Sequence, residues 1–154
     1  MPGWQMLSVM KATGGIDVGK YAESMIKDPD FRPSSETQTL DFGCCEIGDL
    51  GFSSHQNPTT TELLSRVKEL GYLCPMDAGP HLRYQFMDQK VDDWALVAME
   101  PIPMTLSSHG VFFLGCRHNG NGGNSNKKKL YIEGFPVAPT GRWNPRLKVV
   151  VACT

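Results

Sequence analysis

HLRYQFMDQKVDDWALVAME, residues 81–100, contains two runs in which polar and apolar side chains alternate. Alternation with a period of two is typical of a half-buried β-strand. The sequence therefore predicts strands over 81–87 and 94–100, joined by the polar loop 88–93 into an antiparallel hairpin. In this register one face of the hairpin is entirely apolar and would be the core side. Its residues are Leu82, Tyr84, Phe86, Ala95, Val97 and Met99.

The other face of the predicted hairpin mixes charged, aromatic and apolar side chains. Directly opposite residues share a face, so symmetric closure places His81 opposite Glu100 and Arg83 diagonal to Glu100. Glu100 would then hold a charged imidazole and accept hydrogen bonds from the guanidinium. Such a mixture is typical of a small-molecule or peptide site, and also of an ordinary sheet face with an ion pair at its rim. The candidate ligand-binding residues are His81, Arg83, Trp94, Leu96 and Glu100.

The period of the apolar residues changes from 3.6 in the first half of the chain to 2 in the second. Helical patterns occupy 17–28, with Asp17 as the expected N-cap, and 59–70, where Thr59 and Glu62 form a capping box. The sequence therefore predicts an α+β fold: two N-terminal-half helices packed on a mostly antiparallel sheet of about five strands. Besides the hairpin, strands are expected over 37–46, 110–118, 130–135 and 146–153, bounded by prolines 101, 103, 136, 139 and 145.

Residues 1–15 show no clear period, so we expect a loose N-terminal segment before a single α+β domain over 16–154. No apolar run is long enough to span a membrane and no signal-peptide pattern occurs, which favours a cytoplasmic protein. The five cysteines are odd in number and include no C-x-x-C pair. A disulfide framework or a zinc ribbon is therefore not expected, and we expect neither a metal nor a cofactor.

Charge is unevenly distributed along the chain. Residues 1–100 hold 8 Lys or Arg and 15 Asp or Glu, whereas residues 101–154 hold 7 and 1. This asymmetry can mark a basic face for a polyanion, or two halves that attract each other within one fold. The formal net charge of −1 argues against a dedicated nucleic-acid-binding protein. The residues that could contact nucleic acid are Lys127, Lys128, Lys129, Arg142 and Trp143.

Two longer segments resemble a group of small hypothetical proteins from uncultured bacteria: ELGYLCPMDAGPHLRYQFMDQ (69–89) and DWALVAMEPI (93–102). The shorter motifs DPDF (28–31) and GDLGF (48–52) share this resemblance. It covers about residues 16–102, and beyond them only the general strand pattern and the RWNP and KVVVAC endings fit. The resemblance implies a bacterial, single-domain soluble protein and brings no activity, ligand or catalytic residue.

These observations leave three hypotheses about function. The first is a binding or interaction module that uses the predicted Arg83/Trp94/Leu96/Glu100 face. The alternatives are a small hydrolase-type enzyme in which Glu100 orients His81 as a base, and a nucleic-acid binder through Lys127–Lys129. The partner stays open among a protein, a small ligand and a second copy of the chain. A Cys116–His118 nucleophile lacks a third, orienting residue, and metal binding through Cys74, His81, Cys116 and His118 has no supporting spacing.

Overall fold

The structure is a computed structural model that describes residues 1–53, 55–118 and 127–153. The Asn/Gly-rich stretch 119–126 lies outside the described residues. Within them the elements follow one another along the chain as α1 (Gly3–Ala12), β1 (Ile16–Val18), α2 (Lys20–Lys27), β2 (Phe42–Glu46), the 3₁₀ helix η1 (Ile47–Leu50), α3 (Thr60–Glu69), α4 (Ala78–Gln85), β3 (Trp94–Val97), β4 (Ile102–Thr105), β5 (Ser108–His118), β6 (Lys128–Val137) and β7 (Lys148–Ala152).

The strands form one mixed sheet in the order β1-β6-β5-β3-β7-β2, and β4 pairs with β5. The pairs β1–β6 and β3–β7 are parallel, and the other four pairs are antiparallel. The α+β class is confirmed. The described residues form seven strands and four α-helices rather than about five and two. Strands β1 and β4 have only three and four residues, and the sequences of α1 and α4 have weak helical patterns.

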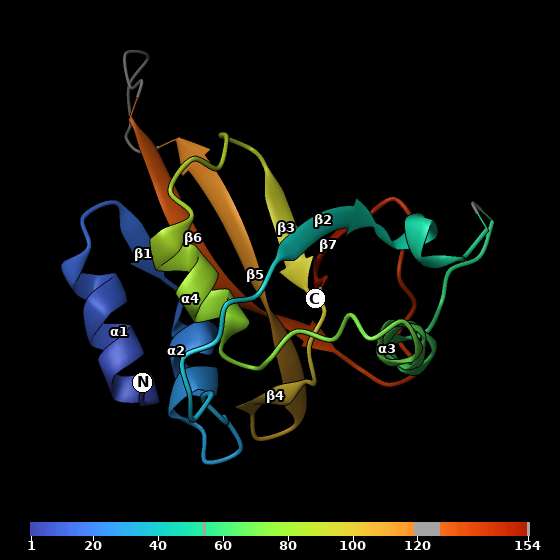
Figure 1. The fold of residues 1–154 in the computed structure, drawn as a ribbon, viewed down its shortest axis with the longest axis horizontal. Coiled ribbons are helices and arrows are strands. Elements are labelled where there is room, and N and C mark those ends of the chain that lie inside the picture. The colour runs from blue at the N-terminus through green and yellow to red at the C-terminus, as the bar shows by residue number, and fades with distance from the viewer. Residues whose placement is uncertain (54, 119–126, 154) are drawn as a thin grey trace.

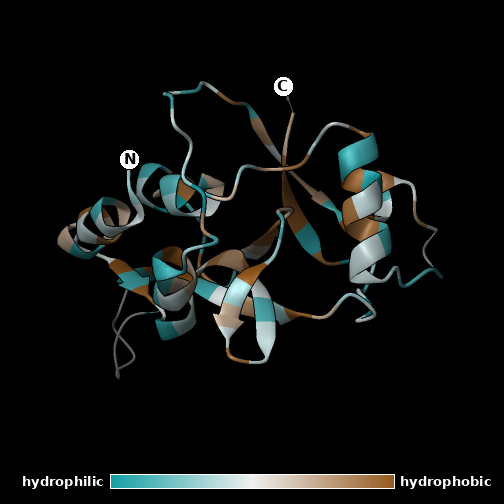
Figure 2. Ribbon diagram, turned by 90° about the horizontal axis from the view of Figure 1, so that it is seen from below, coloured by the Kyte–Doolittle hydropathy of each residue, from teal (hydrophilic) through white to brown (hydrophobic). Residues whose placement is uncertain are grey.

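Three helices, α1, α2 and α4, pack over one face of β1, β6 and β5 (Figure 1). The contact between α4 and the sheet is close, since a Cβ added to Gly79 would lie 3.0 Å from Phe112. Helix α3 lies apart from these three, beside η1 (Figure 1). It is amphipathic (Figure 2) and buries Leu63 and Val67. Residues from both ends of the chain, from Met6 to Ala152, share one hydrophobic cluster.

The first fifteen residues are not a loose segment. Residues 3–12 form α1, whose Met6 and Met10 side chains are fully buried and whose Leu7 is nearly so. Helix α1 contacts α2, α4 and β1. Burial of the two methionines and the leucine stabilises this helix although its sequence has little amphipathic period.

Helix α2 is capped from a distant strand. Its N-cap is Gly19 rather than the expected Asp17, which lies in β1. The Glu133 carboxylate of β6 accepts a hydrogen bond from the Ala22 backbone N–H at 3.1 Å and so takes the role of a capping side chain. A Cβ at position 19 would lie 1.8 Å from a Glu133 carboxylate oxygen, so this close approach requires glycine.

Helix α3 agrees with the expectation from the sequence. The Thr59 hydroxyl accepts a hydrogen bond from the Glu62 N–H at 3.1 Å, and Gly71 follows the helix with a φ of 74°. Pro103 and Pro136, expected at strand boundaries, instead lie within β4 and β6. No helix in the described part of the chain combines the length and apolar character needed to cross a bilayer.

The predicted hairpin over 81–100 is wrong. Residues 78–85 form α4, with Asp77 as its N-cap. Pro80 fits in the first turn because the first four N–H groups of a helix have no partner within it. Strand β3 pairs with β5 and β7, not with the segment 81–87. The alternation in that segment does not reflect a strand: its Arg83 is buried, and Leu82 and Tyr84 are only partly buried.

Candidate functional site

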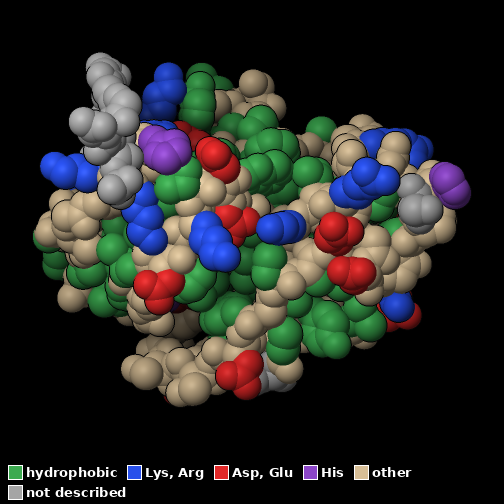
Figure 3. All heavy atoms as spheres, turned by 90° about the horizontal axis from the view of Figure 1, so that it is seen from above, with side chains coloured by type: hydrophobic (Ala, Val, Ile, Leu, Met, Phe, Trp, Pro, Cys, Tyr) green, Lys and Arg blue, Asp and Glu red, His purple; other side chains and the backbone are tan. Residues whose placement is uncertain are grey.

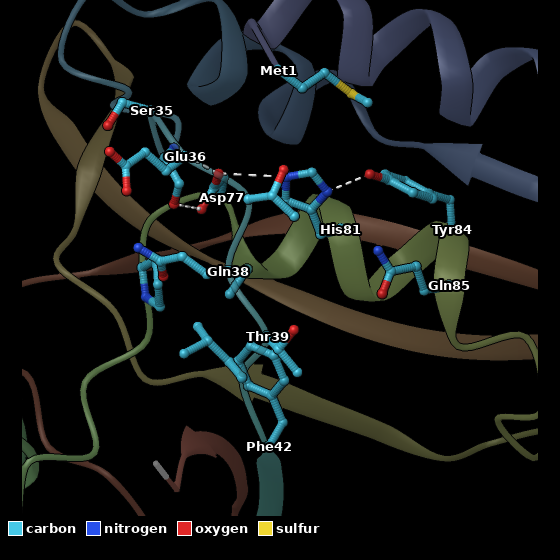
Figure 4. A pocket seen from close by; sticks show the side chains of 15 residues that line it. Met1, Ser35, Glu36, Gln38, Thr39, Phe42, Asp77, His81, Tyr84 and Gln85 are labelled. Carbon is cyan, nitrogen blue, oxygen red and sulfur yellow. Dashed lines mark hydrogen bonds and ion pairs between the residues drawn. The ribbon is translucent and has the colours of Figure 1, made fainter.

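A cavity of about 490 Å³ lies between α4, the extended segment 34–40 and the start of β2 (Figure 4). Apolar side chains form part of its wall, among them Leu40 and Phe42. Three residues of α4 or its N-cap, Asp77, His81 and Tyr84, also line it. Their spacing of four and three residues places them on one side of the helix.

The His81 imidazole is held at both ring nitrogens (Figure 4). Its Nε2 lies 3.4 Å from an Asp77 carboxylate oxygen, and its Nδ1 is hydrogen-bonded to the Tyr84 hydroxyl. In the neutral tautomer with its proton on Nε2, that proton faces the Asp77 carboxylate, which can only accept. The Nδ1 lone pair of a neutral ring then accepts the Tyr84 proton, and the three groups form a continuous path from the carboxylate to the phenol.

Asp77 is a buried carboxylate with several donors. Its side chain is 4 % exposed. The Ser34 backbone N–H donates to Oδ2 at 2.7 Å and the Ser34 hydroxyl donates to Oδ1 at 3.0 Å. These bonds fix the carboxylate and join the segment 34–40 to α4. They also engage the Ser34 hydroxyl with Asp77 rather than with His81, so Ser34 is a positioning residue.

The Tyr84 phenol is protonated at neutral pH. Burial raises its pKa above the ordinary value, and the nearby negative charge of Asp77 acts in the same direction. A protonated phenol is the donor that the His81 Nδ1 requires. The carboxylates of the wall are Glu36 and Asp77, and no Lys or Arg is among the described residues that line the cavity.

Arg83, a predicted surface ligand residue, is instead fully buried (0 % exposed). Its Nη1 donates to the Gln89 side chain at 2.7 Å and to the Gly115 and Tyr131 carbonyls at 3.1 and 3.3 Å. Its Nη2 donates to the Phe86 carbonyl at 2.7 Å, and its Nε has no partner among the residues that the structure describes. Burial lowers its pKa to about 10, so it stays charged at neutral pH. Arg83 therefore fastens α4 to β5 and β6.

The other predicted ligand residues do not join His81. Leu96 is a core residue of β3, 1 % exposed, and Trp94 is an exposed residue of the same strand. Glu100 forms an ion pair with Lys68 of α3 rather than with His81 or Arg83. The predicted Arg83/Trp94/Leu96/Glu100 face therefore does not exist as one surface, because it depended on the hairpin.

The residues expected to contact nucleic acid are also separated. Lys128 and Lys129 begin β6 and Lys127 precedes them, whereas Arg142 and Trp143 follow the other end of that strand. Trp143 is 6 % exposed and its indole N–H donates to the Thr60 hydroxyl at 2.8 Å, so it offers no free ring for stacking. Arg142 donates to the Asn57 carbonyl.

The cysteines of the chain are free thiols and none lines the cavity. Cys116 is buried while His118 is exposed, although both belong to β5. Within residues 1–53, 55–118 and 127–153 no group of three or more His, Cys, Asp or Glu side chains could hold a metal ion.

His81 was identified from the sequence, whereas Asp77 and Tyr84 were missed. Their spacing was visible, but it has meaning only if residues 77–84 are helical. The Ser34 contact joins residues 43 positions apart and has no local signal. No family model, curated protein or solved structure matches the chain.

Proposed function

We propose that the chain is an enzyme that moves a proton on a small polar molecule bound in the cavity beside α4. The observation that carries the proposal is the His81 ring, held between a buried carboxylate and a protonated phenol at the cavity wall. A carboxylate that orients an imidazole, which in turn activates a hydroxyl, is an arrangement used in general acid–base catalysis.

Tyr84 is the group that would touch the bound molecule. A carbon-bound proton passes to the Tyr84 oxygen while the phenol proton passes to His81 Nδ1, and the electron pair of the broken C–H bond stays on the ligand. Asp77 stabilises the resulting imidazolium. Return of a proton by the reverse path to a different atom is an isomerisation, and loss of a leaving group from the ligand is an elimination.

The charge of the wall selects the ligand class. Two acidic side chains line the cavity, and none of its described lining residues is Lys or Arg, so an anionic ligand would be repelled. The Glu36 carboxylate, the Thr37 hydroxyl and the Gln38 amide can form hydrogen bonds with hydroxyl or amino groups of a ligand. We therefore propose a neutral or cationic ligand rich in hydroxyl or amino groups.

A deuterium-exchange experiment tests this function. Neutral polyols, sugars and amino alcohols are first screened for thermal stabilisation of the protein, with sugar phosphates and dicarboxylates as anionic comparisons. Each stabilising compound is then incubated with the protein in D₂O, and deuterium entering carbon positions is measured by mass spectrometry. Tyr84→Phe should slow the exchange by about 10²–10⁴-fold, and Tyr21→Phe, an exposed tyrosine on α2, should not.

Two outcomes would contradict the proposal. One is that only the anionic compounds stabilise the protein. The other is that a compound binds and exchanges at the same rate in the wild type and in Tyr84→Phe.

A further inference from the structure

Four aromatic side chains lie together on the sheet face that points away from α1, α2 and α4: Trp94, Phe113, Tyr131 and Phe135. We call this set the aromatic face. Gly115 pairs with both Trp94 and Tyr131 in the strand register, so these residues share a face. Their neighbours in β5 and β6 alternate to the other side, where Phe112 meets Gly79 of α4 and Gly134 meets Met25 of α2. The aromatic face is therefore on the side opposite these three helices. It is partly covered from elsewhere, since Leu96 and Val111 of the same face are buried and the Phe135 ring packs against Trp143.

Three rings of the aromatic face form a contact chain. The Phe113 ring centroid lies 5.6 Å from that of Tyr131 and 6.1 Å from that of Phe135, both edge to face. The tip of the Tyr131 ring lies over Gly115, where an added Cβ would be 2.1 Å from it. Trp94 is 39 % exposed and Phe135 is 37 % exposed. Because residue 115 has no side chain, the Tyr131 ring packs directly against the backbone of β5.

Basic side chains lie at the end of the aromatic face where β5 ends and β6 begins. Figure 3 shows Lys and Arg side chains on this part of the surface, with Asp and Glu side chains among them. Arg117 and Lys129 are directly opposite each other on this face. The Arg117 guanidinium lies 5.3 Å from the centre of the Tyr131 ring and also pairs with Asp17. That ion pair is exposed on both sides, so Arg117 can exchange Asp17 for another anion at little cost.

Acidic side chains also lie near these residues: Asp92 is close enough to raise the pKa of Tyr131, and two others are engaged elsewhere. Glu133 lies on the same face by register, but its carboxylate accepts from the Ala22 and Gly134 backbone N–H groups. Asp93, next to Trp94, pairs with Lys148. Lys127 adds one exposed positive side chain next to this end of β6. Lys128 alternates to the other side of the sheet and donates to the Gln89 carbonyl at 3.1 Å.

We propose that the aromatic face binds single-stranded nucleic acid. Exposed rings on neighbouring strands supply stacking platforms for unpaired bases, and the basic end supplies contacts to phosphates. A duplex is excluded as the preferred ligand because its bases are stacked on each other and cannot reach the rings. This surface is separate from the cavity beside α4, so the inference does not depend on the proposed enzyme activity.

Fluorescence anisotropy with fluorescein-labelled 12-nucleotide oligo(dT) and oligo(U) at low salt tests the inference, with a 12-base-pair duplex as comparison. Stacking contributes about 1–3 kcal/mol per base, which corresponds to about 5- to 150-fold in affinity. Trp94→Ala and Phe135→Ala should each weaken binding by this factor. Trp4→Ala, which removes a 70 % exposed tryptophan of α1, is the matched control and should leave the affinity unchanged.

Charge is tested with a second pair of variants. Arg117→Gln should weaken binding and reduce its salt dependence, whereas Lys27→Gln makes the same charge change on α2 and should do neither. Circular dichroism confirms that each variant is folded. The inference is overturned if neither oligonucleotide binds, if the duplex binds as tightly as the single strands, or if Trp4→Ala weakens binding as much as Trp94→Ala.

Discussion

Replacement of Arg83 by methionine tests most directly whether this residue is buried in α4, as observed, or exposed on the predicted hairpin. Methionine retains the long apolar stem and removes the guanidinium. The change deletes four hydrogen bonds and leaves the buried carbonyls of Gly115 and Tyr131 without this donor. A hydrogen bond from a charged donor contributes about 1.5–3 kcal/mol. The desolvation of the guanidinium and its unpartnered Nε offset part of that sum.

We therefore expect Arg83→Met to lower the free energy of unfolding by about 1–3 kcal/mol, the cost of leaving a buried acceptor without its donor. This is a large part of the roughly 5–15 kcal/mol of a typical domain. Equilibrium urea unfolding followed by tryptophan fluorescence measures it, with Arg142→Met as control. Arg142 is exposed and makes one hydrogen bond to the Asn57 carbonyl, so its replacement should cost under about 1 kcal/mol. If the two variants cost the same, Arg83 is at the surface and the packing of α4 described above is wrong.

Three further outcomes are expected. Gly19→Ala should cost about 1–2 kcal/mol in urea unfolding because its methyl group displaces the Glu133 cap of α2; an unchanged midpoint would contradict the capping role. The folded-state pKa of Tyr84 is raised, so the wild type loses stability as the pH rises above the ordinary tyrosine value; Tyr84→Phe should lose less in thermal melts from pH 7 to 11. Burial raises the pKa of the Cys74 thiol to about 12, so Cys74 and the buried Cys116 should resist Ellman's reagent at pH 8 until the protein is unfolded, and equal labelling of all five cysteines would disprove this burial.

Elements with strong local signals were predictable from the sequence. Helix α3 combines a capping box at Thr59 and Glu62, a buried stripe, and a glycine at position 71 that adopts a positive φ. Strands β5 and β7 have runs of apolar, branched or aromatic residues longer than any competing helical pattern. In these segments propensity, period and capping favour the same structure, and the tertiary contacts agree with them.

Helix α4 could not be predicted in the same way because its local patterns conflict. Residues 81–87 alternate in polarity, whereas Asp77 and Pro80 are typical of a helix N-terminus. The conflict is resolved by contacts distant in sequence: Arg83 donates to carbonyls 32 and 48 positions away. An arginine is normally read as a surface residue, and nothing near it in the sequence shows that carbonyls of two strands would surround it.

The wrong prediction of a strand over residues 81–87 also explains which residues of the two candidate sites could be identified from the sequence. His81 was predicted to be a base oriented by a carboxylate, and it is oriented by one, but the carboxylate is Asp77 of its own helix and not Glu100. Trp94 was predicted to lie on a partly aromatic face. Its aromatic neighbours come from β5 and β6, and the register brings together residues as far apart in the sequence as Trp94 and Phe135, 41 positions.

Arg83 links the two candidate sites, which lie on opposite sides of strands β5 and β6. From the helix side it holds the carbonyls of Gly115 and Tyr131. On the opposite side of the same residue pair, the Tyr131 ring lies over Gly115 and forms the centre of the aromatic face. His81 and Tyr84, whose side chains line the cavity, lie on α4 within one turn of Arg83. The buried guanidinium therefore fixes the helix that bears the proton path and the strand pair that bears the stacking rings, which gives a physical reason for an arginine without a carboxylate partner in the core.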